Sequence, residues 1–293
     1  MTSVTMFTGK GGVGKTTCAA ATALHYASPD TPVLAISTDA TPSLAHIFES
    51  SAVEKPAQVA PSLYVNEIGE AETRQMWDEK FGREVHEVFS AFVDIDYESF
   101  VEFMTSVLPG LGEEFMVDYI REMSLKGDYG NIVWDTAPLG QTLSLLETPA
   151  LLGKHLKMAP RIYSRLKLGR RSREPVLDIL KRWEQLSAAD MEFLRNEVEF
   201  NMVTIPEALA VEQLSGTFRE LERYGLSVKR IIVNNVVMEP DSDFLRAKSE
   251  QQQVYLKHIH DKYSHLEITE LPMFPGEVKG LERLKEVGNL LFP

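Results

Sequence analysis

A short glycine-rich segment near the start of the chain has the residue types and spacing that hold phosphate groups. Residues 9–17 read GKGGVGKTT and match the pattern G-x-x-x-x-G-K-[ST], between an apolar strand and a helix. Glycines let the backbone curve tightly, so that successive N–H groups and the helix N-terminus converge on phosphate oxygens. Lys15 is expected to reach the β- and γ-phosphates, and the Thr16 hydroxyl to bind Mg²⁺. The predicted phosphate-binding residues are Gly9, Lys10, Gly11, Gly12, Val13, Gly14, Lys15, Thr16 and Thr17.

A lysine directly after the first glycine adds a second cation to this loop. Lys10 resembles the variant of the phosphate loop in which this lysine contacts phosphate across a dimer interface. The variant implies a homodimer in which Lys10 and Lys15 both serve catalysis. The alternative is a solvated loop lysine with no part in the reaction. We favour the functional interpretation.

Two acidic residues follow predicted strands, Asp39 after 33–36 and Asp135 after 132–134. Ligands of open α/β sheets bind at the carboxyl ends of the strands. Because phosphoryl transfer depends mainly on positioning and charge stabilisation, we expect Asp39 to orient the attacking water and Asp135 to hold Mg²⁺ through water. A single aspartate at a strand end is often only a helix cap. The predicted metal-site residues are Thr16, Asp39 and Asp135.

Short apolar runs alternate with long helical stretches, which is typical of a mostly parallel sheet flanked by helices. The predicted fold class is α/β, a P-loop NTPase with an inserted α-helical subdomain. Residues 1–70, 128–148 and 198–293 are expected to form the nucleotide-binding core, and residues 71–127 and 149–197 the helical subdomain. The predicted strands are Val4–Phe7, Val33–Ile36, Leu63–Ile68, Ile132–Trp134, Phe200–Ile205, Val228–Val233 and Ile268–Leu271.

The composition excludes several classes of protein. With 43 acidic and 30 basic residues in 293, the net charge of −13 argues against nucleic acid as a partner. One cysteine, Cys18, permits neither an intrachain disulfide nor a cysteine-rich metal site, and we expect it to be a buried apolar residue. Without an apolar stretch of about 18 residues or a signal-peptide pattern, the expected location is the cytoplasm, with transient contact to a membrane surface left open.

Motifs beyond the loop extend from one end of the chain to the other. They are GKGGVGKTT (9–17), STD with Ser43-Leu44 (37–44), DTAPLGQT (135–142), TIPEALAVE (204–212), IIVNN (231–235) and LPMFPGEVKG (271–280). In this order they resemble the arsenical pump-driving ATPase family, which includes the targeting factor for tail-anchored membrane proteins. The resemblance implies ATP and Mg²⁺, a homodimer, Lys10 as the intermonomer lysine and Asp39 as the carboxylate that activates water.

The resemblance also implies nucleotide contacts away from the phosphate loop. Glu207 and Asn234 match family positions near the nucleotide, and Asn234 is suited to reading the adenine edge. Where some members carry a zinc-binding CxxC pair, this chain has Ser242 and Leu245, so no zinc is expected. The segment that matches the loop over the base and ribose consists of Pro272, Met273, Phe274, Pro275, Gly276, Glu277, Val278 and Lys279.

Two helical blocks could bind something other than nucleotide. Residues 100–123 are rich in methionine and aromatic residues, a pattern more often found in a core than in a ligand groove. Residues 154–173 hold eight basic residues and no acid, which fits a solvated helix face as well as a surface for anionic headgroups. An apolar stripe over 281–291 is expected to pack on the core, since it lacks the basic face of a membrane-binding helix.

The leading hypothesis is a Mg²⁺-dependent ATPase whose nucleotide-driven homodimer closure controls a helical client-binding subdomain. Its clients would be hydrophobic tail-anchored membrane proteins. The alternative is an ATPase subunit that drives an anion-efflux membrane partner. A partition-like ATPase that assembles on DNA or membrane is a third class, but the basic patch or basic terminal helix expected of it is missing.

Overall fold

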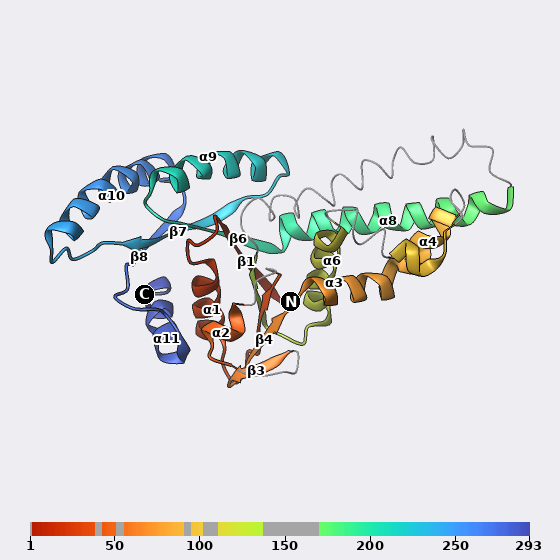
Figure 1. Cartoon of the computed structure of the whole chain (residues 1–293), viewed down its shortest axis with the longest axis horizontal. Helices are drawn as coiled ribbons and strands as arrows, with labels where there is room; N and C mark the ends of the chain where they lie inside the picture. The colour runs from red at the N-terminus through yellow and green to blue at the C-terminus, as the bar shows by residue number, and fades with distance from the viewer. Residues whose placement is uncertain (1, 39–42, 51–55, 91–94, 102–110, 137–169) are drawn as a thin grey trace. The chain divides into compact units, whose positions relative to one another are not determined.

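The computed structural model describes residues 2–38, 43–50, 56–90, 95–101, 111–136 and 170–293. These residues form two compact units, which we describe separately (Figure 1). The first unit contains the described parts of Met1–Ile68, Met123–Leu143 and Glu197–Pro293. The second contains the described parts of Gly69–Glu122 and Ser144–Asn196.

An 8-stranded sheet forms the centre of the first unit, with its described strands in the order β3-β4-β2-β5-β1-β6-β7-β8. All neighbouring strands run parallel except β3 and β4, which are antiparallel. Parallel neighbours need crossover connections, which place helices on the faces of the sheet. The strands are β1 (Ser3–Gly9), β2 (Val33–Ser37), β3 (Ala57–Ala60), β4 (Leu63–Glu67), β5 (Asn131–Asp135), β6 (Val198–Thr204), β7 (Val228–Val236) and β8 (Glu267–Pro272).

The apolar runs of the sequence explain the central strands. Every residue of β2 is buried, and so is every residue of β1 after Ser3. All seven predicted strands are present, and the mostly parallel α/β sheet is confirmed. The sequence did not predict β3, whose four residues AQVA are partly or fully exposed and pair irregularly with β4 at the edge of the sheet. A short edge strand has one neighbour and little burial, so it needs no apolar run.

Helices cover both faces of this sheet. Figure 1 shows α1 and α11 on one face and α9 and α10 on the other. Helices α1 and α11 approach closely, because a Cβ on Gly288 would lie 3.3 Å from the carbonyl oxygen of Ala21. Leu284, Val287 and Leu291 of the C-terminal stripe are buried and pack on the core as expected, whereas Leu281 and Leu290 of the same stripe are exposed. The helices of this unit are α1 (Lys15–Tyr26), α2 (Leu44–Ile47), α9 (Ala208–Arg223), α10 (Asp243–Lys262) and α11 (Gly280–Leu291).

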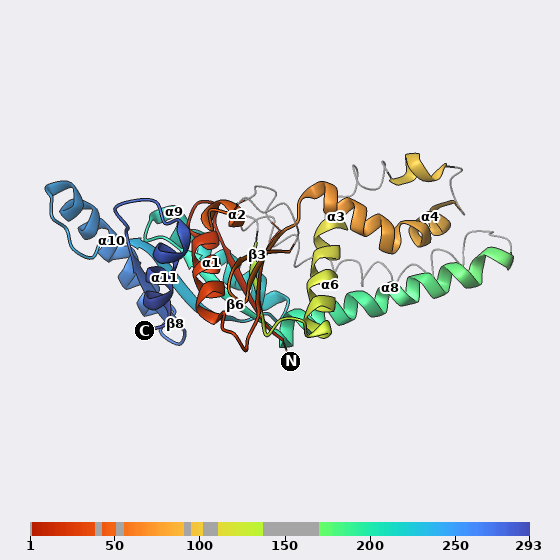
Figure 2. The same ribbon diagram turned by 90° about the horizontal axis from the view of Figure 1, so that it is seen from below.

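In the second unit every regular element that the structure describes is helical (Figure 2). Trp77, Phe100, Met116, Val117 and Ile120 are buried there. No described helix of either unit combines the length and apolarity needed to span a bilayer. The helices are α3 (Glu70–Trp77), the π-helical turn η1 (Asp78–Gly82), α4 (Arg83–Ser90), α6 (Leu111–Lys126), which runs on into the first unit, and α8 (Arg170–Asn196).

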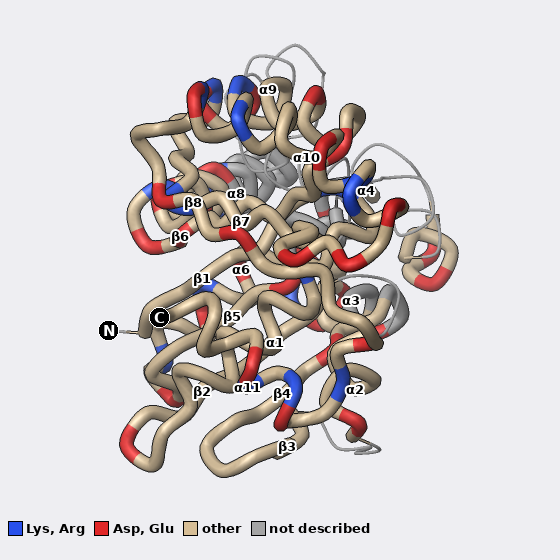
Figure 3. The backbone as a smooth tube through the Cα atoms, turned by 90° about the vertical axis from the view of Figure 1, so that its left-hand side faces the viewer, with Lys and Arg blue, Asp and Glu red and all other residues tan. Residues whose placement is uncertain are grey.

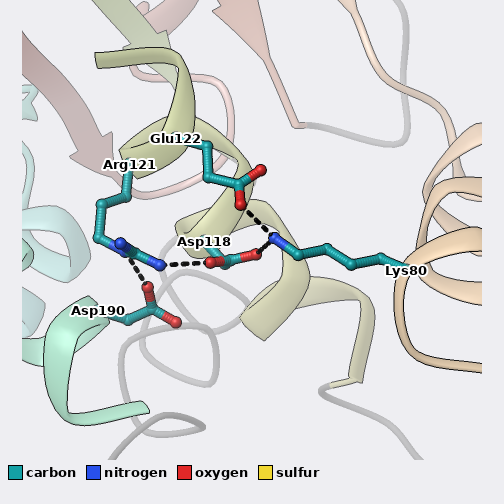
Figure 4. A network of polar contacts seen from close by, with 5 residues as sticks. All are labelled: Lys80, Asp118, Arg121, Glu122 and Asp190. Carbon is teal, nitrogen blue, oxygen red and sulfur yellow. Dashed lines mark hydrogen bonds and ion pairs between the residues drawn. The ribbon is translucent and has the colours of Figure 1, made fainter. Parts of the chain in front are cut away.

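A network of charged side chains, partly buried, joins three of these helices (Figure 4). Arg121 of α6 donates to Asp118 of the same helix and to Asp190 of α8, both at 2.6 Å. Lys80 of η1 forms ion pairs with Asp118 and, at 2.7 Å, with Glu122. Three carboxylates therefore face two cations, and the side chains of Asp118 and Asp190 are buried. Burial raises the pKa of Asp190 to about 7, against the opposing effect of its hydrogen bond to Arg121.

Candidate nucleotide-binding site

Three glycines with positive φ shape the loop between β1 and α1. Gly9, Gly12 and Gly14 have φ values of 155°, 78° and 98°. A Cβ on Gly9 would lie 2.2 Å from the carbonyl oxygen of Val203, and a Cβ on Gly14 would lie 2.3 Å from Nδ2 of Asn234. Backbone conformation and space therefore both require glycine at positions 9 and 14. The result is a tightly curved loop that opens directly into the N-terminus of α1.

The predicted lysines and threonines of the loop lie at this helix N-terminus. Lys15 is buried, and its Nζ donates to the carbonyl oxygen of Lys10 at 3.3 Å. Thr16 is half-buried, and its Oγ1 lies 3.4 Å from Oγ of Ser43, at the start of α2. Lys10 is half-buried as well and forms no ion pair with another described residue. Lys15 and the first N–H groups of α1 are thus placed to hold phosphate oxygens.

The side chain of Asn234 contacts the phosphate loop directly. From β7, its Nδ2 donates to the carbonyl oxygen of Val13 at 2.9 Å. This contact fixes the buried turn of the loop. A role of Asn234 at the adenine edge stays a prediction from the family resemblance.

Asp135 ends β5 beside the loop and is buried. Its carbonyl oxygen accepts a hydrogen bond from the N–H of Thr38 at 3.2 Å, and Nε1 of Trp134 donates to the Thr38 hydroxyl at 3.1 Å. Hydrogen bonds therefore join the carboxyl end of β5 to Thr38, the residue that follows β2 and precedes Asp39. Asp39 itself lies outside the described residues.

Cys18 confirms the expectation of a buried, unreactive thiol. Burial raises its pKa to about 12, and the nearby negative charge of Asp135 acts in the same direction. At neutral pH the thiol therefore stays protonated and is a poor nucleophile.

One functional candidate was not predicted from the sequence. Glu67 ends β4, and its Oε1 accepts hydrogen bonds from the N–H groups of Ser43 and Leu44, each at 2.7 Å, and of Ala45 at 3.3 Å. The available signal was an acidic residue at a strand end, as for Asp39 and Asp135. Glu67 carries no further signal because it belongs to no phosphate-binding motif.

The predicted base-binding segment 272–279 connects β8 to α11. The N–H of Met273 donates to the carbonyl oxygen of Val236 at 2.8 Å, and Phe274 packs partly against the core. The segment reaches α2, because Oε1 of Glu277 lies 3.9 Å from Nε2 of His46, and both side chains are largely exposed. Glu207 precedes the first residue of α9 in an extended conformation and is exposed. No described contact joins Glu207 to the loop.

The donor set suits a magnesium ion bound together with phosphates. A threonine hydroxyl and a carboxylate are hard oxygen ligands, and Mg²⁺ in such sites uses few protein ligands beside phosphate and water. Within the part of the chain that the structure describes, no group of three His, Cys, Asp or Glu residues could hold a metal ion by itself. Thr16 and Asp135 fit the role of partial ligands, and the expected absence of zinc stays a prediction.

A central strand, a loop that requires glycine, a buried lysine and a hydroxyl at the helix N-terminus together define a P-loop nucleoside triphosphatase. Residues 2–293 match the family described as anion-transporting ATPase, and the chain belongs to this family. The enzyme is therefore an ATPase, and the resemblance found from the sequence motifs is confirmed.

Relatives of this chain carry two kinds of name. It is 30% identical to "Putative arsenical pump-driving ATPase 2" of Aquifex aeolicus, over 98% of each chain. It is 31% identical to ATPase GET3A of Arabidopsis thaliana, over 94% of this chain and 80% of that protein. It is 27% identical to the ATPase ASNA1 homolog of Dictyostelium discoideum, over 97% of this chain and 87% of that protein.

Proposed function

We propose that this chain is a Mg²⁺-dependent ATPase that works as a homodimer, in which nucleotide-driven closure controls a client-binding surface on the helical second unit. One observation carries the coupling. Thr16 contacts Ser43, Ser43 is held by Glu67, and Glu67 lies two residues before Gly69, the first residue of the second unit. A change at the phosphate loop thus has a short hydrogen-bonded path to the chain segment that enters that unit.

In the proposed reaction a water oxygen attacks the γ-phosphorus of ATP, and the bond to the β-phosphate oxygen breaks. Lys15 and the N–H groups of the loop hold the phosphates, and Thr16 and Asp135 hold the metal ion. When bound, Mg²⁺ would neutralise charge on the phosphate oxygens. Asp39 orients the water from the segment that follows Thr38. Catalysis by this site rests on positioning and charge rather than on a covalent intermediate.

Lys10 carries the argument for a dimer. It is a cation beside the phosphate loop with no ionic partner among the described residues. A partly exposed lysine without such a partner is available to an anionic ligand. In a homodimer with two-fold symmetry, Lys10 of each subunit would meet the nucleotide of the other subunit.

The nucleoside would lie between Asn234, Glu207 and the segment 272–279. Phe274 is partly buried and stands between two prolines, which supports a role in covering the base. Pro275, Gly276 and Glu277 are exposed and so are accessible to a ligand.

The proposed clients are hydrophobic segments of tail-anchored membrane proteins, in line with the family resemblance and with relatives named GET3A and ASNA1 homolog. In the ATP-bound dimer, a groove for such a segment would be lined in part by Met104, Leu108, Phe115 and Met116. In this structure Met116 is buried, and the side chains of the other three residues lie outside what the structure describes. In Figure 3, acidic and basic residues are interspersed along α9 and α10 of the first unit, so these two helices offer no continuous basic surface for nucleic acid.

The decisive experiment uses the Asp39→Asn variant, which is expected to bind ATP without hydrolysing it. The variant is incubated with a labelled hydrophobic helical peptide of about 20 residues, the length of a membrane-spanning helix, in ATP and in ADP. Binding that depends on ATP is expected. Binding that is absent, or equal in both nucleotides, would contradict the client-binding function.

The second candidate is an ATPase subunit that drives an anion-efflux membrane partner, favoured by the relative named as an arsenical pump-driving ATPase. With only Cys18 in the chain, and that thiol buried, a thiol site for arsenite is not available. Hydrolysis should therefore not respond to arsenite or antimonite. Stimulation by either anion, together with no peptide binding, would favour this candidate.

A further inference from the structure

Glu67 makes an unusual set of contacts for a residue outside every recognised motif. One carboxylate oxygen accepts hydrogen bonds from three successive backbone N–H groups, those of Ser43, Leu44 and Ala45. Parallel pairing of β2 with β4 puts Glu67 opposite Ser37, at the edge of the sheet where ligands bind. Hydrogen bonds to an ionised carboxylate are roughly twice as strong as those between neutral groups. Glu67 therefore fixes the backbone at the start of α2.

The segment that Glu67 holds contacts the phosphate loop. Ser43 Oγ lies 3.4 Å from Oγ1 of Thr16, the candidate Mg²⁺ ligand. Asp39 lies four residues before Ser43 in the sequence. Thr38, the residue before Asp39, is held by hydrogen bonds with Asp135 and Trp134. Glu67 thus supplies the anchor on the other side of the predicted water-orienting residue.

Glu67 is also close in sequence to the second unit. The next residue, Ile68, donates from its N–H to the carbonyl oxygen of Ser37 at 3.1 Å, and Gly69 begins the second unit. The N–H of Gly69 donates to Oε2 of Glu72 at 3.0 Å, in the first turn of α3. Glu67, which holds Ser43, thus lies two residues before the first residue of the second unit.

We propose that Glu67 is a positioning residue: it holds Ser43–Ala45 so that Thr16 and Mg²⁺ are set for the nucleotide, and it passes a change in that segment to the start of α3. The first role concerns the ATPase site alone. The second role rests on the proposed function, in which nucleotide controls the helical unit.

The first test compares Glu67→Gln with Glu199→Gln. Glu199 pairs with Lys229 at 2.6 Å near the amino end of β6, opposite to the loop, so its variant controls for loss of a carboxylate charge. Without nucleotide, Glu67→Gln should speed backbone amide exchange at Ser43–Ala45. The Mg²⁺ concentration for half-maximal tightening of ADP binding should rise roughly fivefold to tenfold. Values equal to those of Glu199→Gln in both measurements would overturn the inference.

A second variant decides the matter if Glu67→Gln fails to fold. Ser43→Ala removes the hydroxyl that faces Thr16 and leaves the three N–H groups bonded to Glu67. It should raise the Mg²⁺ concentration for half-maximal tightening of ADP binding and leave amide exchange at Leu44–Ala45 unchanged. An unchanged Mg²⁺ dependence would overturn the inference.

The relay to α3 is read from amide exchange at residues 69–77, with MgADP and with a non-hydrolysable ATP analogue. In the unaltered protein the two nucleotides should give different exchange, and Glu67→Gln should abolish the difference. A difference that survives in Glu67→Gln would overturn the relay while the proposed function stands. No difference in the unaltered protein would overturn the proposed coupling, and the Mg²⁺ titration would still decide the local role of Glu67.

Discussion

The side-chain amide of Asn234 donates a hydrogen bond to the carbonyl oxygen of Val13 across 221 positions of the chain. The contact ties the end of β7 to the phosphate loop. It also explains why Gly14 cannot carry a side chain, since a Cβ there would meet the same Nδ2 atom at 2.3 Å. The shape of the phosphate loop therefore depends on a strand near the far end of the sequence.

The first prediction follows from this contact. Gly14→Ala should lower the free energy of unfolding by about 1–3 kcal/mol from backbone strain and should abolish ADP binding. In the double variant with Asn234→Ala the clash is absent, so the loss of stability should be smaller than the sum of the two single losses. Chemical denaturation and ADP titration measure both effects.

Gly216 provides the matched control. It lies inside α9, and a Cβ added there would meet nothing within 4 Å, so Gly216→Ala should be neutral or stabilising by about 0.5–1 kcal/mol. Equal losses in Gly14→Ala and Gly216→Ala, or strictly additive losses in the double variant, would contradict the geometry of the loop.

The second prediction concerns the water-orienting carboxylate. Asp39→Asn should keep ATP affinity within about twofold and lower the turnover rate by about 100-fold or more, because the carboxylate acts on water and not on the nucleotide. Steady-state hydrolysis and equilibrium ATP binding test the two parts. Asp30→Asn, in an exposed turn, is the control and should behave like the unaltered protein. Near-normal turnover in Asp39→Asn would remove Asp39 from the mechanism.

The third prediction concerns the dimer. Lys10→Ala and Lys15→Ala should each lose most hydrolysis while the subunits stay folded. If Lys10 acts on the nucleotide of the other subunit, a heterodimer of the two variants contains one intact site, and mixing them should restore part of the activity. If both lysines act within one subunit, the mixture contains no intact site and stays inactive. Circular dichroism and subunit-exchange assays supply the measurements.

The fourth prediction uses the buried charges of the second unit. Burial raises the pKa of Asp190 to about 7, so the folded protein binds this proton more tightly than the unfolded chain. Its effect on the free energy of unfolding is therefore absent only well below the ordinary aspartate pKa of 3.8, grows more unfavourable as pH rises toward 7, and is constant above that. Asp190→Asn should thus gain stability relative to the unaltered protein between pH 5 and pH 8, by on the order of 2 kcal/mol.

Glu122→Gln is the control for that experiment, because Glu122 pairs with Lys80 but is 45% exposed. Its effect on the free energy of unfolding should be small and nearly constant over the same pH range. An Asp190→Asn variant whose stability relative to the unaltered protein does not change between pH 5 and pH 8 would show that Arg121 holds Asp190 ionised throughout.

The phosphate loop, the seven longer strands and the buried Cys18 could all be predicted from the sequence. Each depends on residues close together in the chain: a glycine pattern before a helix, a run of apolar residues, a small residue on a packed face. The edge strand β3 could not be predicted, because AQVA has no such pattern and forms only by pairing with β4.

The sequence by itself determined that this chain has a phosphate-binding loop and a mostly parallel sheet, since local residue order dictates backbone curvature and strand burial. Only the tertiary structure decided that Asn234 supports the loop and that Glu67 holds Ser43 beside Thr16. It alone brought Asp118 and Asp190 together around Arg121. These contacts join residues far apart in the chain, and they depend on which strands and helices become neighbours, which no local pattern specifies.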